Sequence, residues 1–339
     1  MPTAVTPPGG PPAGPPPGPP AGPPPEARRG LTGHTAAVTC VALPADGRFV
    51  LSGSDDHTLR LWDPARGEEI RRWDAHEDGV KCVALSPDGR LAVSGGVWGP
   101  ACLWDTSTGT EIRRLQGQQM GTMAAAFSPE GRLVATGGGD CTVRCWDPMT
   151  GQELRRLQGH TADVTAIAFS PDRRLVLSGD MQVEAGDDHV RLWDLEGGKE
   201  LCRLGQGLLV VTAVAFASRG ALALATTMDG WLHRWEAATG RELGNVEVGA
   251  GSLLCLAVSP DGRGLLTGSG TDFHDRGTVG GLGADNTVRL LDPADCRELH
   301  RFEAHAGNVN DVAFTSDGRQ AVSASADRTV RIWDVPEQM

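Results

Sequence analysis

Residues 33–63 read GHTAAVTCVALPADGRFVLSGSDDHTLRLWD, a stretch that opens with Gly-His and closes with Trp-Asp. Between these ends, short runs rich in Val, Leu and Thr alternate with Pro, Gly and Asp. Such runs predict short β-strands joined by tight turns. Similar stretches recur along the rest of the chain, so the repeat, rather than any single motif, decides the fold.

Tryptophan marks the length of the repeat. It recurs at Trp62, Trp104, Trp146, Trp193, Trp235 and Trp333, and Leu291 fills the one remaining position. The successive intervals are 42, 42, 47, 42, 56 and 42 residues. This spacing describes a unit of 42 residues present seven times, with 5 extra residues in unit four and 14 in unit six. A period of this length predicts one repeat domain, rather than the two domains that 339 residues would otherwise suggest.

The units resemble WD repeats, which are named for their Trp-Asp ending, and the resemblance covers residues 26–339. The resemblance implies an all-β fold, a seven-bladed β-propeller of four-stranded antiparallel blades. The last unit stops shortly after Trp333 and Asp334 and lacks an outer strand, whereas residues 27–31 match one. We therefore expect an N-terminal strand to pair into the last blade and close the ring, which removes open sheet edges.

Residues 1–25 differ from the rest of the chain, because they contain 13 of its 23 prolines together with five glycines. Such a segment cannot form a hydrophobic core. We expect a disordered, partly polyproline-II extension, followed by the propeller over residues 26–339. PxxP spacings within the extension fit either a linker or a recognition motif for aromatic grooves, and the sequence leaves both open.

The resemblance also implies a hydrogen-bond network inside each blade. It links the Gly-His histidine, a Ser or Thr on the second strand, a turn aspartate and the repeat tryptophan. Three units carry all four members: His34, Ser52, Asp56 and Trp62; His160, Ser178, Asp187 and Trp193; His305, Ser323, Asp327 and Trp333. The other units keep parts of it: His76, Ser94 and Trp104; Thr136, Asp140 and Trp146; Asp229 and Trp235; Thr267 and Asp285. In the incomplete units, Gln118, Gly207 and Gly249 replace the histidine, and Trp98 replaces the aspartate of unit two.

Asp, His and Ser together also raise the question of a hydrolase triad. The complete set occurs once in each of three units, whereas an active site is not normally made in triplicate. The sequence also contains no P-loop, Gly-x-Ser-x-Gly or His-Glu-x-x-His motif. We therefore interpret the set as structural and expect no catalytic residues.

Two clusters could suggest a metal. Cys141 and Cys145 are spaced as CxxxC, but no second pair accompanies them. The second is Asp272, His274, Asp275 and Asp285 in the glycine-rich loop of unit six, where Asp285 is already assigned as the turn aspartate. Neither cluster has a complete ligand set, so we expect no metal and no cofactor.

The charge of the chain limits its partners. A net charge of −12 argues against nucleic acid and anionic membranes, which require a basic footprint. No stretch approaches the ~18 apolar residues of a membrane span, and no secretory signal is evident. Cys40, Cys82 and Cys255 share one repeat position, which is typical of small buried core residues rather than disulfides. We expect a cytoplasmic, monomeric propeller.

Apolar residues in the loops of units four to six suggest a partner surface. Both insertions lie in turns between the second and third strands, which the resemblance places on the same face as the Gly-His loops. The candidates for binding are Met181, Val183, Leu208, Leu209, Met228, Trp231 and Phe273. The alternative is that these side chains pack on their own loops.

Three classes of function remain open. The first is a non-catalytic scaffold or adaptor that binds protein or peptide partners on the loop face, and this is the class we favour by analogy with the fold. The second is a regulatory or sensor module of a larger signalling assembly. The third, a propeller enzyme with its site at the channel mouth, is less favoured because the inner strands are mostly Ala, Val, Leu and Cys.

Overall fold

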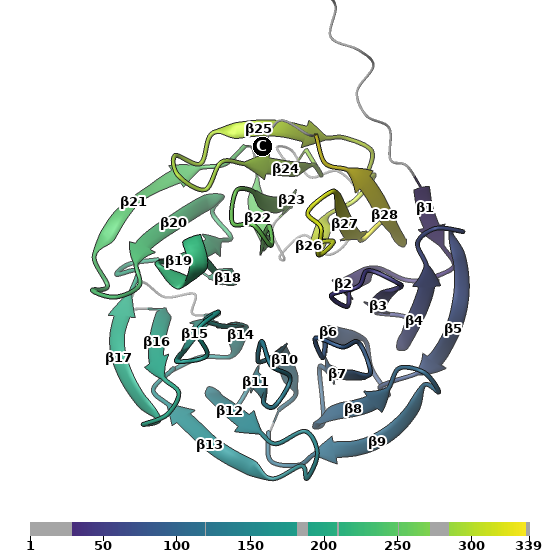
Figure 1. Cartoon of the computed structure of the whole chain (residues 1–339), viewed down its shortest axis with the longest axis horizontal. Helices are drawn as coiled ribbons and strands as arrows, with labels where there is room; N and C mark the ends of the chain where they lie inside the picture. The colour runs from purple at the N-terminus through teal and green to yellow at the C-terminus, as the bar shows by residue number, and fades with distance from the viewer. Residues whose placement is uncertain are drawn as a thin grey trace, which may run out of the picture.

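A computed structural model describes residues 29–118, 120–181, 189–208, 210–249, 251–271 and 285–336. These residues form seven four-stranded antiparallel sheets, arranged as blades around a central axis (Figure 1). The predicted seven-bladed propeller is confirmed. The proline-rich segment 1–25 lies outside the described residues, so its disorder stays a prediction.

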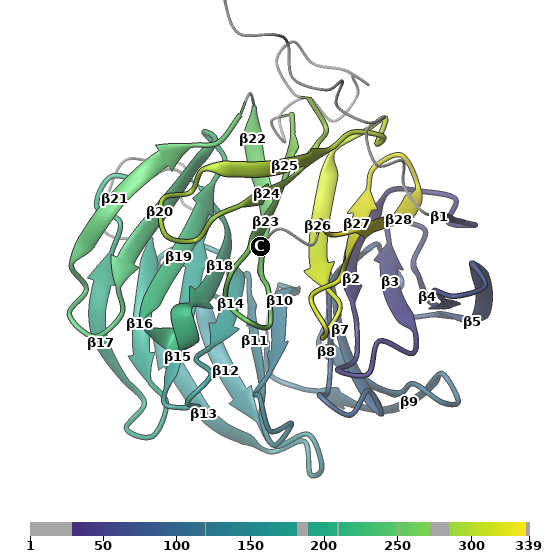
Figure 2. The ribbon, with the colours of Figure 1, turned by 45° about the horizontal axis from the view of Figure 1, so that its top comes forward.

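Each blade uses its four strands in the same order from the axis to the rim (Figures 1 and 2). The inner strands are β2 (Val38–Ala42), β6 (Val80–Leu85), β10 (Thr122–Phe127), β14 (Val164–Phe169), β18 (Val211–Ala217), β22 (Ser252–Val258) and β26 (Val309–Phe314). The second strands are β3 (Val50–Ser54), β7 (Leu91–Gly96), β11 (Val134–Gly138), β15 (Leu175–Asp180), β19 (Leu222–Thr227), β23 (Leu265–Gly270) and β27 (Gln320–Ser325).

The remaining two strands of each blade lie toward the rim. The third strands are β4 (Thr58–Asp63), β8 (Ala101–Asp105), β12 (Thr142–Trp146), β16 (Val190–Asp194), β20 (Trp231–Glu236), β24 (Val288–Leu291) and β28 (Thr329–Asp334). The outer strands are β5 (Glu68–Asp74), β9 (Thr110–Leu115), β13 (Glu153–Gln158), β17 (Lys199–Leu204), β21 (Glu242–Glu247), β25 (Glu298–Phe302) and β1 (Arg29–Thr32). A short 3-10 turn, η1 (Ser218–Gly220), joins β18 to β19.

The position of a strand in its blade follows from its side chains. Every residue of the second strand β3 (VLSGS) is buried, because this strand has sheet neighbours on both sides and adjacent blades on both faces. The outer strand β5 (EEIRRWD) is exposed at all but one residue, so it can carry charges. Small and apolar residues therefore build the interior of the disc, and charged strands build its rim.

The hydrophobic core is divided among the junctions between blades. The described residues form seven clusters of buried apolar side chains, and each cluster joins two consecutive blades. Trp62 of blade one, for example, packs with Val330 and Ile332 of blade seven. Leu291 takes the place of tryptophan in blade six and is equally buried, at the junction with blade five.

A glycine on the second strand permits the close contact between blades. A Cβ added to Gly137 would lie 2.5 Å from Cγ1 of Val164 in the next blade. Gly53 and Gly268 face Val80 and Val309 in the same way. These glycines are required for close approach rather than for an unusual backbone conformation.

The ring closes where the two ends of the folded chain meet. β1 pairs antiparallel with β28, with Leu31 opposite Val330, and so supplies the outer strand of blade seven. Leu31 is 1% exposed and belongs to the cluster that joins blades seven and one. The expected closure is confirmed, and the junction has a core like the other six.

Candidate functional site

Blade one contains a chain of hydrogen bonds from its tryptophan to its turn aspartate. Trp62 Nε1 donates to Ser52 Oγ at 2.8 Å. Ser52 Oγ lies 2.8 Å from His34 Nε2, and His34 Nδ1 lies 2.8 Å from Asp56 Oδ2. Because a carboxylate only accepts, Nδ1 carries the proton, and Nε2 of a neutral ring accepts the Ser52 hydroxyl proton. Each polar group in the chain is thus satisfied.

The titration of these groups fits that arrangement. Burial lowers the pKa of His34, in spite of the opposing effect of Asp56, so the ring is neutral. Burial alone would raise the pKa of Asp56. Hydrogen bonds from the Thr58 hydroxyl, the Thr35 backbone N–H and His34 outweigh it and hold the pKa of Asp56 well below its usual range. The blade therefore holds a neutral imidazole against a charged carboxylate.

Blade seven repeats this geometry. His305 Nδ1 lies 2.8 Å from Asp327 Oδ2, and His305 Nε2 lies 2.7 Å from Ser323 Oγ. Trp333 Nε1 donates to the same hydroxyl at 2.8 Å. The pKa of Asp327 is lowered, because bonds from His305 and Thr329 outweigh the opposing effect of burial.

Blade four builds the same chain with a different carboxylate. His160 lies 2.6 Å from Ser178, which also accepts from Trp193 at 2.8 Å. His160 Nδ1, however, is 2.8 Å from Oδ2 of Asp180, and the other oxygen of Asp180 lies 3.0 Å from His189. Asp187, the predicted member, lies outside the described residues. The observed partner comes from the end of the second strand and not from the turn.

In blade three, Gln118 replaces the histidine of the network. The Thr136 hydroxyl donates to Gln118 Oε1 at 2.8 Å, and Gln118 Nε2 donates to Asp140 at 2.9 Å. Trp146 donates to Thr136 at 2.8 Å, as the tryptophans of complete blades do to serine. The amide supplies one acceptor and one donor at the positions where the imidazole supplies Nε2 and Nδ1.

In blade six, an arginine replaces the histidine. A Cβ built on Gly249 would fall inside the guanidinium of Arg289, which therefore occupies the space of the missing side chain. Arg289 is 1% exposed, pairs with Asp285, and donates from Nε to Glu298 at 3.0 Å. The Thr267 hydroxyl is buried and has no hydrogen-bond partner among the described residues, because blade six has no histidine or tryptophan to bond with it.

Blades two and five each lack one or more members of the network. In blade two, His76 and Trp104 each lie 2.8 Å from Ser94 Oγ. Trp98, in the place of the aspartate, is 65% exposed. In blade five, Asp229 is exposed, and the buried Trp235 stacks on His233 with a centroid separation of 5.8 Å.

The buried serines of the three complete networks are held in structural hydrogen bonds. Ser52, Ser178 and Ser323 have no exposed surface, and each accepts a tryptophan N–H. A nucleophile needs access to substrate, which these hydroxyls lack. Within the described residues, no group of three or more His, Cys, Asp or Glu side chains could hold a metal ion.

A second network connects the third strand with the outer strand and was missed in the sequence. Buried Arg60 and Arg144 each donate to a carboxylate nine residues later, Glu69 and Glu153, at 2.7 Å. Arg191 with Glu200 and Arg289 with Glu298 repeat the pair. The recurring nine-residue spacing of Arg and Glu was the available signal.

The candidate partner residues of blades four to six divide into three groups. Met181, Met228 and Trp231 are half-buried. Leu208 is 8% exposed and packs in the same core cluster as Trp235, so it does not form part of a surface. Val183, Leu209 and Phe273 lie outside the described residues.

Met181 and Met228 occupy equivalent places in blades four and five. The backbone N–H of Met181 donates to Asp163 O at 2.9 Å, and that of Met228 donates to Val210 O at 3.0 Å. Each bond ties the turn between second and third strands to the loop that enters the inner strand. We call the face formed by these turns and loops the loop face.

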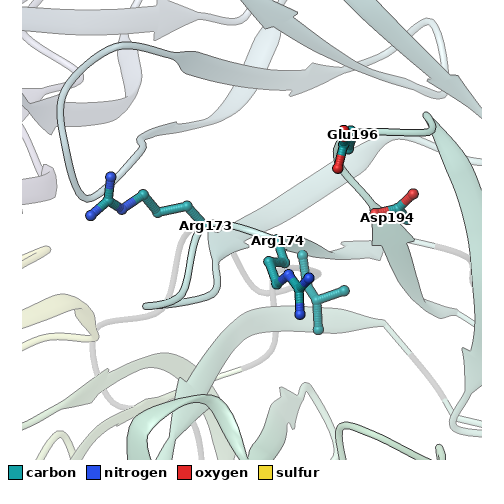
Figure 3. Close-up of a pocket in the computed structure, with 5 residues that line it drawn as sticks. Arg173, Arg174, Asp194 and Glu196 are labelled. Carbon is teal, nitrogen blue, oxygen red and sulfur yellow. The ribbon is translucent and has the colours of Figure 1, made fainter.

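A shallow pocket of about 270 Å³ lies at the opposite face, on blade four (Figure 3). It is lined by Arg173, Arg174, Leu175, Asp194 and Glu196. Figure 3 shows the Arg173 side chain extending away from the two carboxylates, and Arg173 lies 3.6 Å from Glu130 of the neighbouring blade. The charges do not converge on one point, so the pocket does not resemble a catalytic site.

The fold and its networks define a seven-bladed propeller built from Trp-Asp repeats. Comparison with known families agrees: residues 26–271 match the model described as "IFT122 first beta-propeller", and residues 296–334 match "WD domain, G-beta repeat". The first match spans more than half of the chain, so the chain belongs to this family of WD-repeat β-propellers. WD-repeat propellers generally act as protein-interaction scaffolds and are typically non-enzymatic.

Curated relatives align over short stretches of 45 to 63 residues. WD repeat-containing protein 36 of Homo sapiens is 37% identical over 63 residues, which are 19% of this chain and 7% of that protein. Cross-pathway control WD-repeat protein 2 of Flammulina velutipes is 52% identical over 46 residues, 14% of this chain and 15% of that protein. Small ribosomal subunit protein RACK1 of Caenorhabditis elegans is 51% identical over 45 residues, 13% and 14% of the two chains. The chain thus spans a small part of each of these relatives.

Proposed function

We propose that this protein is a non-catalytic scaffold that binds protein or peptide partners on its loop face. The observation that carries the proposal is the way in which buried networks hold the turns of this face. Asp56, Asp180 and Asp327 each tie a turn or strand end to the preceding Gly-His loop. Loops fixed on a rigid frame are preorganised for recognition.

The half-buried residues Met181, Met228 and Trp231 supply apolar surface on blades four and five of that face. Methionine adapts its shape to a partner, and tryptophan is enriched at binding hot spots. Leu208 has no part in this surface, because it is buried. We propose these three side chains as the partner-binding patch of blades four and five.

We further propose a cytoplasmic location and a single-chain propeller. All eight cysteines are free, which fits a reducing compartment. Among the described residues, no helix is long or apolar enough to cross a membrane. Net charge of −12 favours basic protein partners over nucleic acid or anionic lipid. A sensor role within a larger assembly would use the same surface.

Partner capture tests the proposal. The full chain is used as bait in the source cell, and its partners are compared with those of Met228→Glu and Trp231→Glu variants. Leu243→Glu, at an exposed residue on the outer strand of the same blade, is the matched control. We expect loss of one or more partners in the two loop-face variants and not in the control. An unchanged set of partners with an intact fold would discard the patch.

A further inference from the structure

Two neighbouring loops carry exposed apolar side chains where blade two joins blade three. Trp98 is 65% exposed and Met120 is 64% exposed, although both side chains are large and apolar. Trp98 lies in the turn between β7 and β8, and Met120 lies in the loop that enters β10. A Cβ on Gly121 would overlap the carbonyl of Val97, so the two loops are in direct contact. They form an apolar surface on the loop face, away from the patch of blades four and five.

The orientation of Trp98 follows from the departure of blade two from its repeat. In blade one the equivalent residue, Asp56, points inward to His34. A tryptophan side chain cannot replace that carboxylate, because indole offers a donor and no acceptor. Its backbone N–H donates instead to Asp78 Oδ2 at 2.6 Å, which fixes the turn and leaves the ring in solvent.

Two acidic residues, Glu77 and Asp78, lie next to the turn that carries Trp98. Asp78 Oδ1 is buried and has no hydrogen-bond partner among the described residues, and Glu77 beside it is exposed. Among the described residues, neither Glu77 nor Asp78 forms an ion pair. Arg114, whose pKa is raised mainly by Glu111 and slightly by Glu77, is hydrogen-bonded to Glu111 at 3.0 Å, and Lys81 is paired with Asp55 at 2.7 Å. The local charge therefore remains negative. An aromatic face beside unpaired carboxylates favours a cation.

We propose that Trp98 and Met120, with Glu77 and Asp78, bind a basic segment of a protein partner, with an arginine or lysine side chain over the Trp98 ring. The inference rests on the proposed scaffold function and names the chemistry of one partner. Arginine fits best, because its planar guanidinium stacks on an aromatic face while it donates to carboxylates. Met120 would cover the aliphatic stem of the same side chain.

Two other occupants fit the charges less well. The proline-rich residues 1–28 contain one basic residue, Arg28, and one acidic residue, Glu26. A second copy of the chain would bring another net charge of −12 against Glu77 and Asp78. Both alternatives predict measurable behaviour that differs from binding of a basic partner.

Titration with peptides of defined charge tests the inference. The full chain is titrated with a fluorescent Arg- and Gly-rich peptide and with the same peptide carrying Glu in place of Arg. We expect salt-sensitive binding of the basic peptide alone, weakened about five- to tenfold by Trp98→Ala and by Glu77→Lys. Trp98→Phe should retain part of the affinity. Met149→Ala, which removes an apolar residue that is 73% exposed in a β12–β13 turn, is the matched control and should bind as the wild type does.

Several results would overturn the inference. The first is equal binding of the basic peptide to the wild type and to Trp98→Ala, and the second is no binding of this peptide at low salt. The third is tighter binding of the peptide after removal of residues 1–25, and the fourth is dimerisation of the chain that Trp98→Ala abolishes. The third result would indicate that the chain's own extension occupies the site. None of them bears on capture of partners through Met228 and Trp231, so failure here is distinguishable from failure of the proposed function.

Discussion

Arg289 fills the space next to Gly249 that a histidine side chain occupies in the complete blades. The two residues depend on each other: glycine leaves room for the guanidinium, and the guanidinium pairs with the aspartate that histidine would have bound. In blade six, a buried pair of arginine and aspartate thus replaces the buried pair of histidine and aspartate. The pKa of Asp285 is lowered there because bonds from Ser269, Thr287 and Arg289 outweigh the opposing effect of burial.

This dependence predicts a cost for any side chain at Gly249. Gly249→Ala should displace Arg289 and lower the free energy of unfolding by roughly 2–4 kcal/mol, the sum of overpacking and a positive φ. Gly207→Ala is the matched control, because its φ of +76° is close to the +73° of Gly249 and nothing lies within 4 Å of its Cβ. Denaturant unfolding gives the comparison. Equal losses in the two variants would show that Arg289 gives way freely.

Blade three predicts how blade one will tolerate change. His34→Gln should reproduce the arrangement of Gln118 and cost less than about 1 kcal/mol. His34→Leu should leave the Ser52 hydroxyl proton without its acceptor, remove one donor to Asp56 and cost roughly 1–3 kcal/mol. The folded-state pKa of His34 is lowered, so its contribution is present above the unfolded value of about 6.5 and is lost as the pH falls below it. His34→Gln should therefore weaken the loss of stability between pH 7 and 5. Equal costs for Gln and Leu would contradict the bridging role.

Blade four offers a test of which carboxylate supports His160. Asp180→Ala removes the acceptor for both His160 and His189, two buried groups, and should cost roughly 2–4 kcal/mol. Asp187→Ala, at the position favoured by repeat spacing, should cost much less. Thermal unfolding of the two variants decides between them, and a larger loss for Asp187→Ala would reverse the assignment.

The seam predicts a sharp difference between two truncations. Removal of residues 1–25 leaves β1 intact and should change the melting temperature little. Removal of residues 1–33 takes away β1, exposes Val330 and the edge of β28, and should lower stability by several kcal/mol. Equal melting temperatures would show that β1 does not close the ring.

Blade number, strand order and closure could be predicted from the sequence because they depend on the strand and turn pattern that recurs in every repeat. The burial of Leu208 and the bond between His160 and Asp180 depend on the local path of the backbone, which residue spacing does not show. The backbone N–H of Leu208 donates to Gly205 O, and the turn closed by this bond places the Leu208 side chain in the core beside Trp235. The sequence shows the apolar residue but not the turn. The role of Asp180 depends on the path of the strand end, which the spacing of Asp187 from Trp193 cannot reveal.

Asp311 makes the stability of the closed ring depend on pH. Its carboxylate accepts the backbone N–H of Val41 across the seam at 2.8 Å, and that of Val312 at 2.9 Å. Burial nevertheless raises the pKa of Asp311 to about 7, and Cys40, Cys82 and Cys255 are the other titratable groups near it. The charged form is thus disfavoured in the fold, so stability falls as the pH rises from the unfolded value of about 4 to about 7.

Asp311→Asn keeps an acceptor for Val41 and removes this titration. Relative to the wild type, it should gain on the order of 1–3 kcal/mol of unfolding free energy between pH 5 and pH 8, since part of the residue remains exposed. Asp88→Asn is the control. The bond from Ser86 lowers the pKa of Asp88, so this carboxyl does not titrate between pH 5 and pH 8. Histidine titration is common to all three proteins and cancels in the differences. Urea unfolding at the two pH values makes the measurement, and a pH-independent difference for Asp311→Asn would mean that the seam carries its carboxylate charged throughout.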